Sequence, residues 1–230
     1  MAIKVKPNVT WFTPEILEFL LELGQNNNTK WFGANKERYE THVWEPMNAL
    51  ARDLIARMAK IDPEIRMTPE EAVFRLYRDT RTSIDKSPFK THAGMLISRS
   101  DATRTAHPGL YIQIAPQAFG IASGFHVLSP VECMAVRRHI AANAEEFKTL
   151  LAGRSFRRHF ATIRGESGKL LPPELTMAAE KQPMIHKRQF YYWAEHHAGR
   201  ILSSNLPEFI MEHMEACRPM NEFLGRALVR

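Results

Sequence analysis

The sequence is poor in cysteine: its 230 residues include only Cys133 and Cys217, and neither belongs to a C-x-x-C motif. Two thiols this far apart do not form the disulfide framework that holds small secreted domains together. Free cysteine is commonly buried as a small hydrophobic residue. We therefore expect two buried free thiols, with a reactive nucleophile as the alternative.

Long hydrophobic runs are missing as well. No stretch of about 20 apolar residues occurs, which excludes a transmembrane helix. Residues 1–7 have neither the apolar core nor the small-residue cleavage pattern of a secretory signal. We therefore expect a cytoplasmic protein, in which a reducing environment keeps both thiols free.

Several catalytic signatures are also absent. The sequence has no G-x-S-x-G, P-loop or G-x-G-x-x-G motif. It therefore lacks the motifs that would indicate a serine hydrolase, a P-loop nucleoside triphosphatase or a Rossmann dinucleotide-binding protein. Its ten histidines contain no H-x-x-x-H or H-E-x-x-H spacing, and the neighbouring rings of His196 and His197 would point apart, so we expect no metal site. No particular cofactor is indicated, and the question of catalysis is left open.

What the sequence does contain is an ordinary globular composition with a basic excess. Hydrophobic residues make up 44% of the chain and charged residues 24%, which is typical of one sizeable core and predicts a single domain over residues 1–230. Lysine and arginine number 31 against 25 aspartates and glutamates, a net charge of +6. This moderate excess favours an anionic partner.

Helical patterns occupy the two ends and the middle of the chain. Residues 13–15, Thr-Pro-Glu, predict a helix start, and Gly24 predicts its end. A second helical region covers 26–58, with interruptions at Gly33 and Pro46. The apolar stripe expected to pack the first helix consists of Ile16, Leu17, Leu20 and Leu21.

A central helical region starts at Ser129, where a capping serine is followed by proline and, at Glu132, by an acidic residue. The pattern continues through Ile140 and, after a break, to Leu150. The last helical segment begins at Asn205, and Pro219 predicts a break within it.

Between these helices the apolar residues recur with a period of two, which is typical of strands. Helices and strands in this order predict an α+β fold, a mainly antiparallel sheet packed by N-terminal, central and C-terminal helices. A hairpin is also expected, in which 156–163 pairs with 170–171 across a turn-rich segment. The predicted strands cover 72–81, 95–97, 110–114, 119–127 and 189–193.

Residues 75–90 are densely charged: five basic and two acidic residues give a net charge of +3. Alternate residues of a strand share a face, so Arg75 and Arg81 would flank Asp79. Arginines placed in this way can hold a carboxylate or phosphate with paired hydrogen bonds. Asp79 would then orient a guanidinium, and its carboxyl pKa would be held too low for a general base.

The loop after this strand predicts further polar groups. Asp85 and Lys86 would form a second charge pair, and Thr82 or Ser83 would donate hydroxyl hydrogen bonds. The structural alternative is a solvated strand face, on which exposed ion pairs contribute little to stability.

The charged segment resembles the signature of a bacterial and fungal family catalogued as domain of unknown function 2461. The defining positions of that signature match Arg75, Arg78, Asp79, Arg81, Asp85 and Lys86. Two positions differ, since Thr82 replaces a phenylalanine and Phe89 replaces the closing tyrosine. The segments 27–39 and 109–114 are similar to the family too. The resemblance implies a fold and a binding site but no reaction, because the family has no established activity.

Asn28 and Trp31 lie in the first of those similar segments and are candidates for a wall of the same site. At i, i+4 spacing, Trp31, Asn35 and Tyr39 would share one helix face. The alternative is that Asn28 caps a helix and Trp31 packs in the core.

A second basic stretch, 137–164, supports a different hypothesis. Here Phe156 and Phe160 alternate with arginines, as in a surface that stacks bases and neutralises phosphates. The alternative is that the phenylalanines point inward. This stretch makes a nucleic-acid or acidic-protein interaction module the second functional hypothesis.

Our leading hypothesis is a pocket for a small anionic ligand that carries a phosphate or carboxylate. The oligomeric state is left open. The residues predicted to form the pocket are Arg75, Arg78, Asp79, Arg81, Asp85 and Lys86, with Asn28 and Trp31 beside them.

Overall fold

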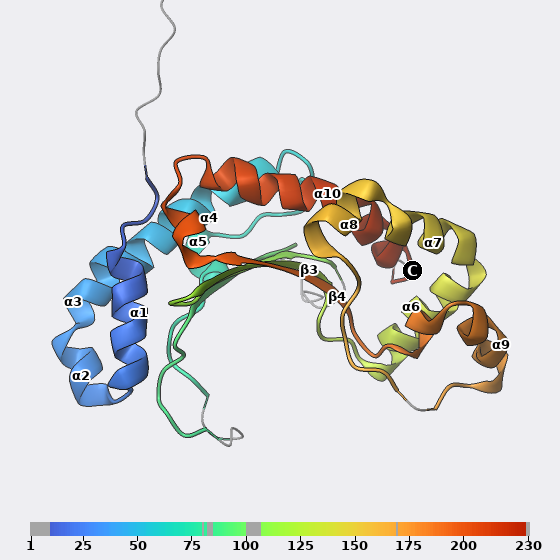
Figure 1. Ribbon diagram of the computed structural model, residues 1–230, viewed down its shortest axis with the longest axis horizontal. Helices are drawn as coiled ribbons and strands as arrows, with labels where there is room; N and C mark the ends of the chain where they lie inside the picture. Colours follow the sequence, from blue (N-terminus) through green and yellow to red (C-terminus); the bar gives the residue numbers. More distant parts are fainter. Residues whose placement is uncertain (1–9, 80, 82–84, 100–106, 169, 229–230) are drawn as a thin grey trace, which may run out of the picture.

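A four-stranded antiparallel sheet forms the centre of the molecule in the computed structural model, which describes residues 10–79, 81, 85–99, 107–168 and 170–228 (Figure 1). The strands lie in the order β1-β2-β3-β4. Their bounds are Ala93–Ile97 for β1, Leu110–Ile114 for β2, Ala118–Phe125 for β3 and Phe190–His197 for β4. The α+β fold predicted from the sequence is confirmed.

The sheet bends into an arch, and helices cover only its convex face (Figure 1). α4 (Glu45–Met58) and α10 (Leu206–Arg226) lie over this face. The concave face opens between the N-terminal helices on one side and the central helices on the other. The N-terminal helices are α1 (Glu15–Gln25), α2 (Thr29–Ala34), α3 (Lys36–Tyr39) and α5 (Pro69–Ala72), with a π-helical turn at Glu40–Trp44.

The central helices all belong to the long connection between β3 and β4. They are α6 (Pro130–Ala142), α7 (Ala144–Ala152), α8 (Arg154–Phe160) and α9 (Pro173–Lys181). Short 3-10 turns follow at Pro183–His186 and, after β4, at Ala198–Leu202. None of the helices among the described residues is both long and apolar enough to span a membrane.

Strand periodicity divides the sheet side chains between two environments. The convex face carries the hydrophobic core, and β2, for example, buries Leu110, Ile112 and Ile114 there. The intervening Tyr111 and Gln113 are half-buried and belong to the concave face. Both cysteines are free and buried, as expected, and burial raises the pKa of the Cys217 thiol to about 12.

Helix starts with local capping signals formed where they were predicted. Ser129 accepts a hydrogen bond from the Glu132 N–H, the Glu132 carboxylate accepts one from the Ser129 N–H, and Pro130 occupies the first position of α6. Asn28 caps α2 through the Trp31 N–H at 2.9 Å. Pro46 stands at the start of α4 and marks the interruption expected in the second helical region.

Four details of the predicted fold were wrong. The expected hairpin at 156–163 is instead helix α8, because Phe156 and Phe160, four residues apart, share one helix face and both pack on Tyr192 at 5.1 Å between ring centroids. α10 does not break at Pro219. The missing proline N–H removes one helical hydrogen bond, and the buried neighbours Cys217 and Met220 hold the helix against the core on either side.

The first helix buries a different stripe from the one predicted. Ile16, Phe19, Leu20 and Leu23 are buried, whereas Leu21 is 48% exposed. Residues 72–81 are also not a continuous strand: α5 ends at Ala72, and isolated bridges pair Val73 with Met95 and Tyr77 with Phe89.

Candidate ligand-binding site

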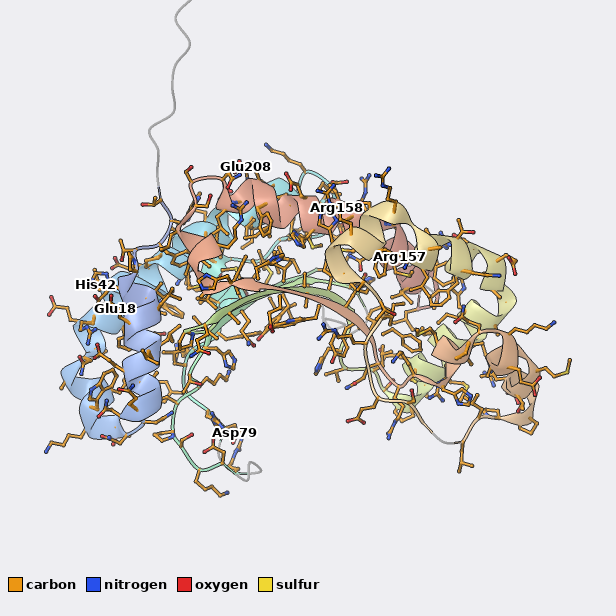
Figure 2. All side chains as sticks on the ribbon, viewed as in Figure 1. Glu18, His42, Asp79, Arg157, Arg158 and Glu208 are labelled. Atoms are coloured by element: carbon orange, nitrogen blue, oxygen red, sulfur yellow. The ribbon has the colours of Figure 1, made fainter. Side chains whose placement is uncertain are left out.

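The charged segment 75–90 folds back on itself as a loop with two paired arms. The Arg78 N–H donates to the Pro88 carbonyl at 2.9 Å, and the Lys90 N–H donates to the Leu76 carbonyl at 2.7 Å. Asp79 lies near the end of this loop, on the concave side of the sheet and beside the N-terminal helices (Figure 2). Thr82 and Ser83, predicted hydroxyl donors, lie outside the described residues.

Arg78 and Asp85 connect the two arms. The Arg78 guanidinium donates to the Asp85 carboxylate and, at 3.4 Å, to the Phe89 carbonyl. Asp85 also accepts the Ser87 N–H at 2.9 Å. Its carboxyl pKa is lowered, first by the hydrogen bonds from Ser87 and then by the charge of Arg78. Arg78 is therefore a half-buried cation, held by a carboxylate that stays ionised.

Asp79 and Arg81 form a separate pair in solvent. Arg81 donates from Nε at 2.9 Å and from Nη2 at 2.6 Å to the two Asp79 oxygens. These bonds lower the pKa of the Asp79 carboxyl, in the direction that the sequence predicted. The Arg81 side chain is 87% exposed, so this pair contributes little to stability.

The other predicted site residues do not converge on these two pairs. Arg75 is exposed and lies near Tyr39. Burial raises the pKa of Tyr39, and the charge of Arg75 lowers it by a smaller amount. Lys86 is exposed. Asn28 caps α2, and Trp31 packs on Phe19 with ring centroids 5.6 Å apart, as the structural alternative held. None of the eight predicted residues lines the hollow on the concave face of the sheet or the cleft beside α10.

The Asn27 side chain links the N-terminal helices to the charged loop. Its side-chain amide donates to the Phe89 carbonyl at 2.9 Å, and its oxygen accepts the Phe89 N–H at 3.0 Å. The Phe89 ring, 1% exposed, stacks on Phe32 with centroids 4.2 Å apart and an interplanar angle of 16°. Phe89, in the place of the family's tyrosine, is thus a core residue.

The concave face of the sheet holds a hollow of about 520 Å³, within the usual range of ligand sites. Aromatic side chains form its floor. Tyr111 of β2 lies at the centre, with ring centroids 6.4 Å from Phe74 and 6.2 Å from Trp193. Tyr191, two residues before Trp193 on the same strand face, also lines the hollow. Its ring centroid lies 4.9 Å from that of His126. We call Phe74, Tyr111, Trp193 and Tyr191 the aromatic row.

Glycines allow these rings to lie close to the strands. A β-carbon on Gly120 of β3 would overlap the six-membered ring of Trp193. A β-carbon on Gly94 of β1 would lie 3.3 Å from the Tyr111 hydroxyl and 3.5 Å from the Phe74 ring. The rings therefore lie over strand positions that have no side chain.

Lys90 and Arg164 place two cations at this floor. Lys90 Nζ lies 5.4 Å from the centroid of the Phe74 ring, a cation–π distance. The pKa of His92 is lowered by burial first and then by the charges of Lys90 and Arg78, which places these three groups near one another. Arg164 lines the hollow, and no aspartate or glutamate does so among the described residues. The charge pattern suits an anion.

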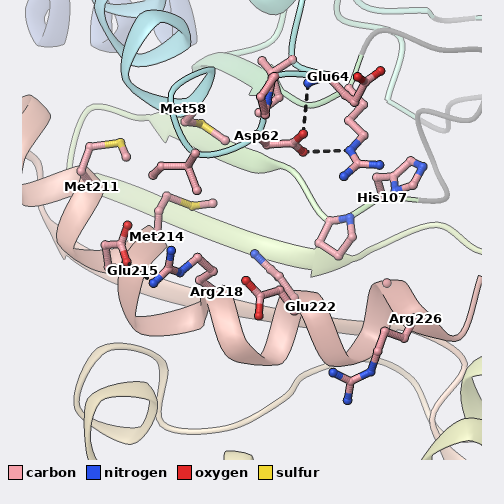
Figure 3. Close-up of a pocket in the computed structure, with 17 residues that line it drawn as sticks. Met58, Asp62, Glu64, His107, Met211, Met214, Glu215, Arg218, Glu222 and Arg226 are labelled. Carbon is pink, nitrogen blue, oxygen red and sulfur yellow. Dashed lines mark hydrogen bonds and ion pairs between the residues drawn. The ribbon is translucent and has the colours of Figure 1, made fainter. Parts of the chain in front are cut away.

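A second cleft, of about 620 Å³, lies between α10 and the segment after α4 (Figure 3). Its charges compensate one another: Asp62 pairs with Arg99 at 2.8 Å, and Glu215 pairs with Arg218 at 3.3 Å. Because its arginines already have carboxylate partners, this cleft has no comparable excess of positive charge.

Both phenylalanines and one arginine of the second basic stretch have structural roles. Phe156 and Phe160 are buried in the core and cannot stack bases, so that part of the nucleic-acid hypothesis was wrong. Arg137 is buried and donates to the carbonyls of Lys187 at 3.0 Å and His186 at 3.1 Å. Arg157 and Arg158 are exposed on α8 (Figure 2), while Lys169 lies outside the described residues.

Sequence reasoning missed the aromatic row. Its signal was present in two places: a tyrosine and a tryptophan at alternate positions 191 and 193, and small residues at 120, 122 and 124 of the neighbouring strand. The part of the chain that the structure describes contains no group of three or more histidine, cysteine, aspartate or glutamate residues able to hold a metal ion.

Fold and site together define a class of protein: an α+β chain whose antiparallel sheet carries its core on one face and an aromatic hollow on the other. The sequence model of a family described as "Conserved hypothetical protein (DUF2461)" matches residues 15–223. The chain belongs to this family, as its charged segment suggested. None of the curated proteins matches it.

Proposed function

We propose that this protein binds a small anionic ligand with a planar ring, on the concave face of the sheet. The observation that carries the proposal is the aromatic row, with Lys90 at the Phe74 end and no carboxylate in the lining of the hollow. The row offers flat apolar faces for a ring, and the neighbouring cations favour a phosphate or carboxylate on it.

The charged loop supplies the anion-binding end of the proposed site. Arg78 would contribute a guanidinium held in place by Asp85, and Lys90 would contribute a point charge. The exposed residues Arg75, Asp79, Arg81 and Lys86 would act at longer range, by raising the local concentration of anions. We retain the cytoplasmic location expected from the sequence as part of the proposal.

Thermal unfolding with three probes tests this function. The probes are a nucleoside monophosphate, the corresponding nucleoside and inorganic phosphate, at equal concentrations. We expect the nucleotide to raise the unfolding midpoint more than either fragment does, because it occupies both halves of the site.

Two variants with the same change of charge separate the site from general electrostatics. Lys90→Gln should remove most of the nucleotide effect, whereas Arg66→Gln should preserve it, since Arg66 lies in solvent beside Glu64 and does not line the hollow. Equal losses in both variants, or no effect of the nucleotide on the parent protein, would contradict the proposal.

A further inference from the structure

We infer that the ligand of the concave face is a segment of single-stranded nucleic acid, whose successive bases stack on the aromatic row. The inference rests on the proposed function and specifies its ligand class. From the basic stretch 137–164, whose phenylalanines are buried, it uses Arg164, which lines the hollow.

The spacing of the rings favours several bases over one. The ring centroids of Phe74, which lies beside β1, of Tyr111 in β2 and of Trp193 in β4 follow one another at 6.4 and 6.2 Å. A single planar ligand would cover one of these rings or two, and the rest of the row would stay exposed to water. A strand with one base for each ring would cover the whole row.

The same spacing excludes a duplex as the ligand. Bases in a duplex lie about 3.4 Å apart along each strand and cover one another's faces. Rings spaced at nearly twice that distance can receive only bases that have separated from such a stack. A four-stranded sheet that carries accessible aromatic side chains on one face is a known physical solution for this task, since each base presents a flat face to a ring. Here Phe74 is exposed, and Tyr111, Trp193 and Tyr191 are half-buried.

The charges at the two ends of the row fit a polyanion. Lys90 lies over Phe74 at one end. Arg164 lies at the other end, where its backbone N–H donates to the Tyr191 carbonyl at 2.6 Å. Between these cations the hollow is lined by no described carboxylate. A phosphate backbone that follows the row would therefore meet a cation at each end. The exposed Glu195, two residues after Trp193 in β4, lies outside the lining of the hollow.

Other occupants match only half of this pattern. An acidic peptide would satisfy the two cations but would leave the ring faces without flat partners. A neutral saccharide would use the rings but not the charges. Both serve as alternative outcomes of the experiment.

Fluorescence anisotropy with a labelled oligothymidylate of about eight nucleotides, a length within the range of single-strand sites, tests the inference. Competitors are the corresponding mononucleotide, a duplex of the same length, polyglutamate and a neutral oligosaccharide. We expect the single strand to bind, the mononucleotide to compete weakly, and the other three to compete poorly.

Ring and charge variants are each compared with a matched control. Trp193→Ala should weaken binding about tenfold or more, and Trp193→Phe should restore most of it because a ring returns. Tyr77→Ala should have little effect, since Tyr77 is 61% exposed but lies outside the hollow. Arg164→Gln should make the slope of log affinity against log salt concentration shallower by about the value of one phosphate contact. Arg218→Gln, in the other cleft, should not.

The outcomes separate this inference from the proposed function. If the mononucleotide binds as tightly as the oligonucleotide, the inference is wrong and the proposed function stands. If polyglutamate or the saccharide competes as well as the single strand, or if Trp193→Ala binds normally, the inference is also wrong. If neither the mononucleotide nor the oligonucleotide binds, both are overturned.

Discussion

Trp193 lies across Gly120: a β-carbon on this glycine would overlap the Cζ2 and Cη2 atoms of the indole and lie 3.0 Å from Cε2. The two residues belong to neighbouring strands, and Gly120 pairs with Glu195 in the register of β3 and β4. The position of the Trp193 ring thus depends on the absence of one side chain.

Gly120→Ala should displace the Trp193 ring. We expect a loss of about 1–3 kcal/mol in the free energy of unfolding, because the methyl group overpacks the contact, and a shift of tryptophan emission to longer wavelength as the ring enters water. Urea unfolding and emission spectra measure both. Gly33→Ala is the control, since nothing lies within 4 Å of its added carbon and alanine favours a helix by about 1 kcal/mol. Similar effects in the two variants would refute the explanation.

Asn27→Ala should release the charged loop from the N-terminal helices. It removes both hydrogen bonds to the backbone of Phe89, and we expect a cost of about 1–3 kcal/mol. Hydrogen exchange of the Phe89 amide should accelerate. Asn26→Ala should leave that amide protected, because the Asn26 side chain bonds only to the Glu22 carbonyl within its own helix turn. Unchanged exchange in Asn27→Ala would count against this role.

His213 should make the protein sensitive to acid. It is 2% exposed and lies 3.1 Å from His196 between their Nε2 atoms, with its Nδ1 2.8 Å from the Phe209 carbonyl. Burial is the largest cause that lowers its pKa to about 4, and His159, His196 and Arg200 add to it. Between the ordinary value of 6.5 and this value, the unfolded chain binds a proton that the folded chain does not.

Stability should therefore be unaffected by His213 above pH 6.5 and should fall as the pH drops toward 4. We expect a contribution of about 2 kcal/mol between pH 8 and pH 5, measured by urea unfolding at both values. His92, His139 and His196 shift in the same direction, so the comparison with His213→Phe isolates this residue. An identical pH dependence in that variant would show that His213 does not contribute.

Arg137→Met should destabilise the protein much more than Arg138→Gln. The first change leaves the carbonyls of His186 and Lys187 without their buried donor, at a cost of about 1–3 kcal/mol. The second removes only an exposed pair with Glu174, which is worth about 0–1 kcal/mol. Chemical unfolding of both variants checks the difference. Equal losses would mean that Arg137 is no more structural than its neighbour.

Local signals in the sequence predicted most of the fold. The caps at Asn28 and Ser129 and the proline at the start of α4 located helices, because each acts within one helical turn. Phe156 and Phe160 were misassigned because their spacing of four was given less weight than the turn residues after them. Pro219 was misassigned because its helix is stabilised by tertiary packing, which a local rule does not include.

The site too has one part that depends on residues close in sequence and another that depends on long-range pairing. The ion pair of Asp79 with Arg81 joins residues close in sequence, and the charge pattern indicated it. The pair of Arg78 with Asp85 was not predicted, since the sequence suggested a pair of Asp85 with Lys86. The hollow joins Tyr111 to Trp193, which depends on the pairing of β3 with β4. That pairing crosses the whole of residues 126–189, and no pattern within either strand specifies it.

This long connection has a consequence for synthesis. The strands β1, β2 and β3 can pair as soon as they leave the ribosome, but β4 and the covering helix α10 follow only after the four central helices. Until then one strand edge and the part of the apolar convex face that α10 covers stay open to solvent, a state prone to association with other chains. Tyr191 and Trp193 arrive with β4, so a nascent or truncated chain that ends before it has an incomplete aromatic row and no capacity to bind through it.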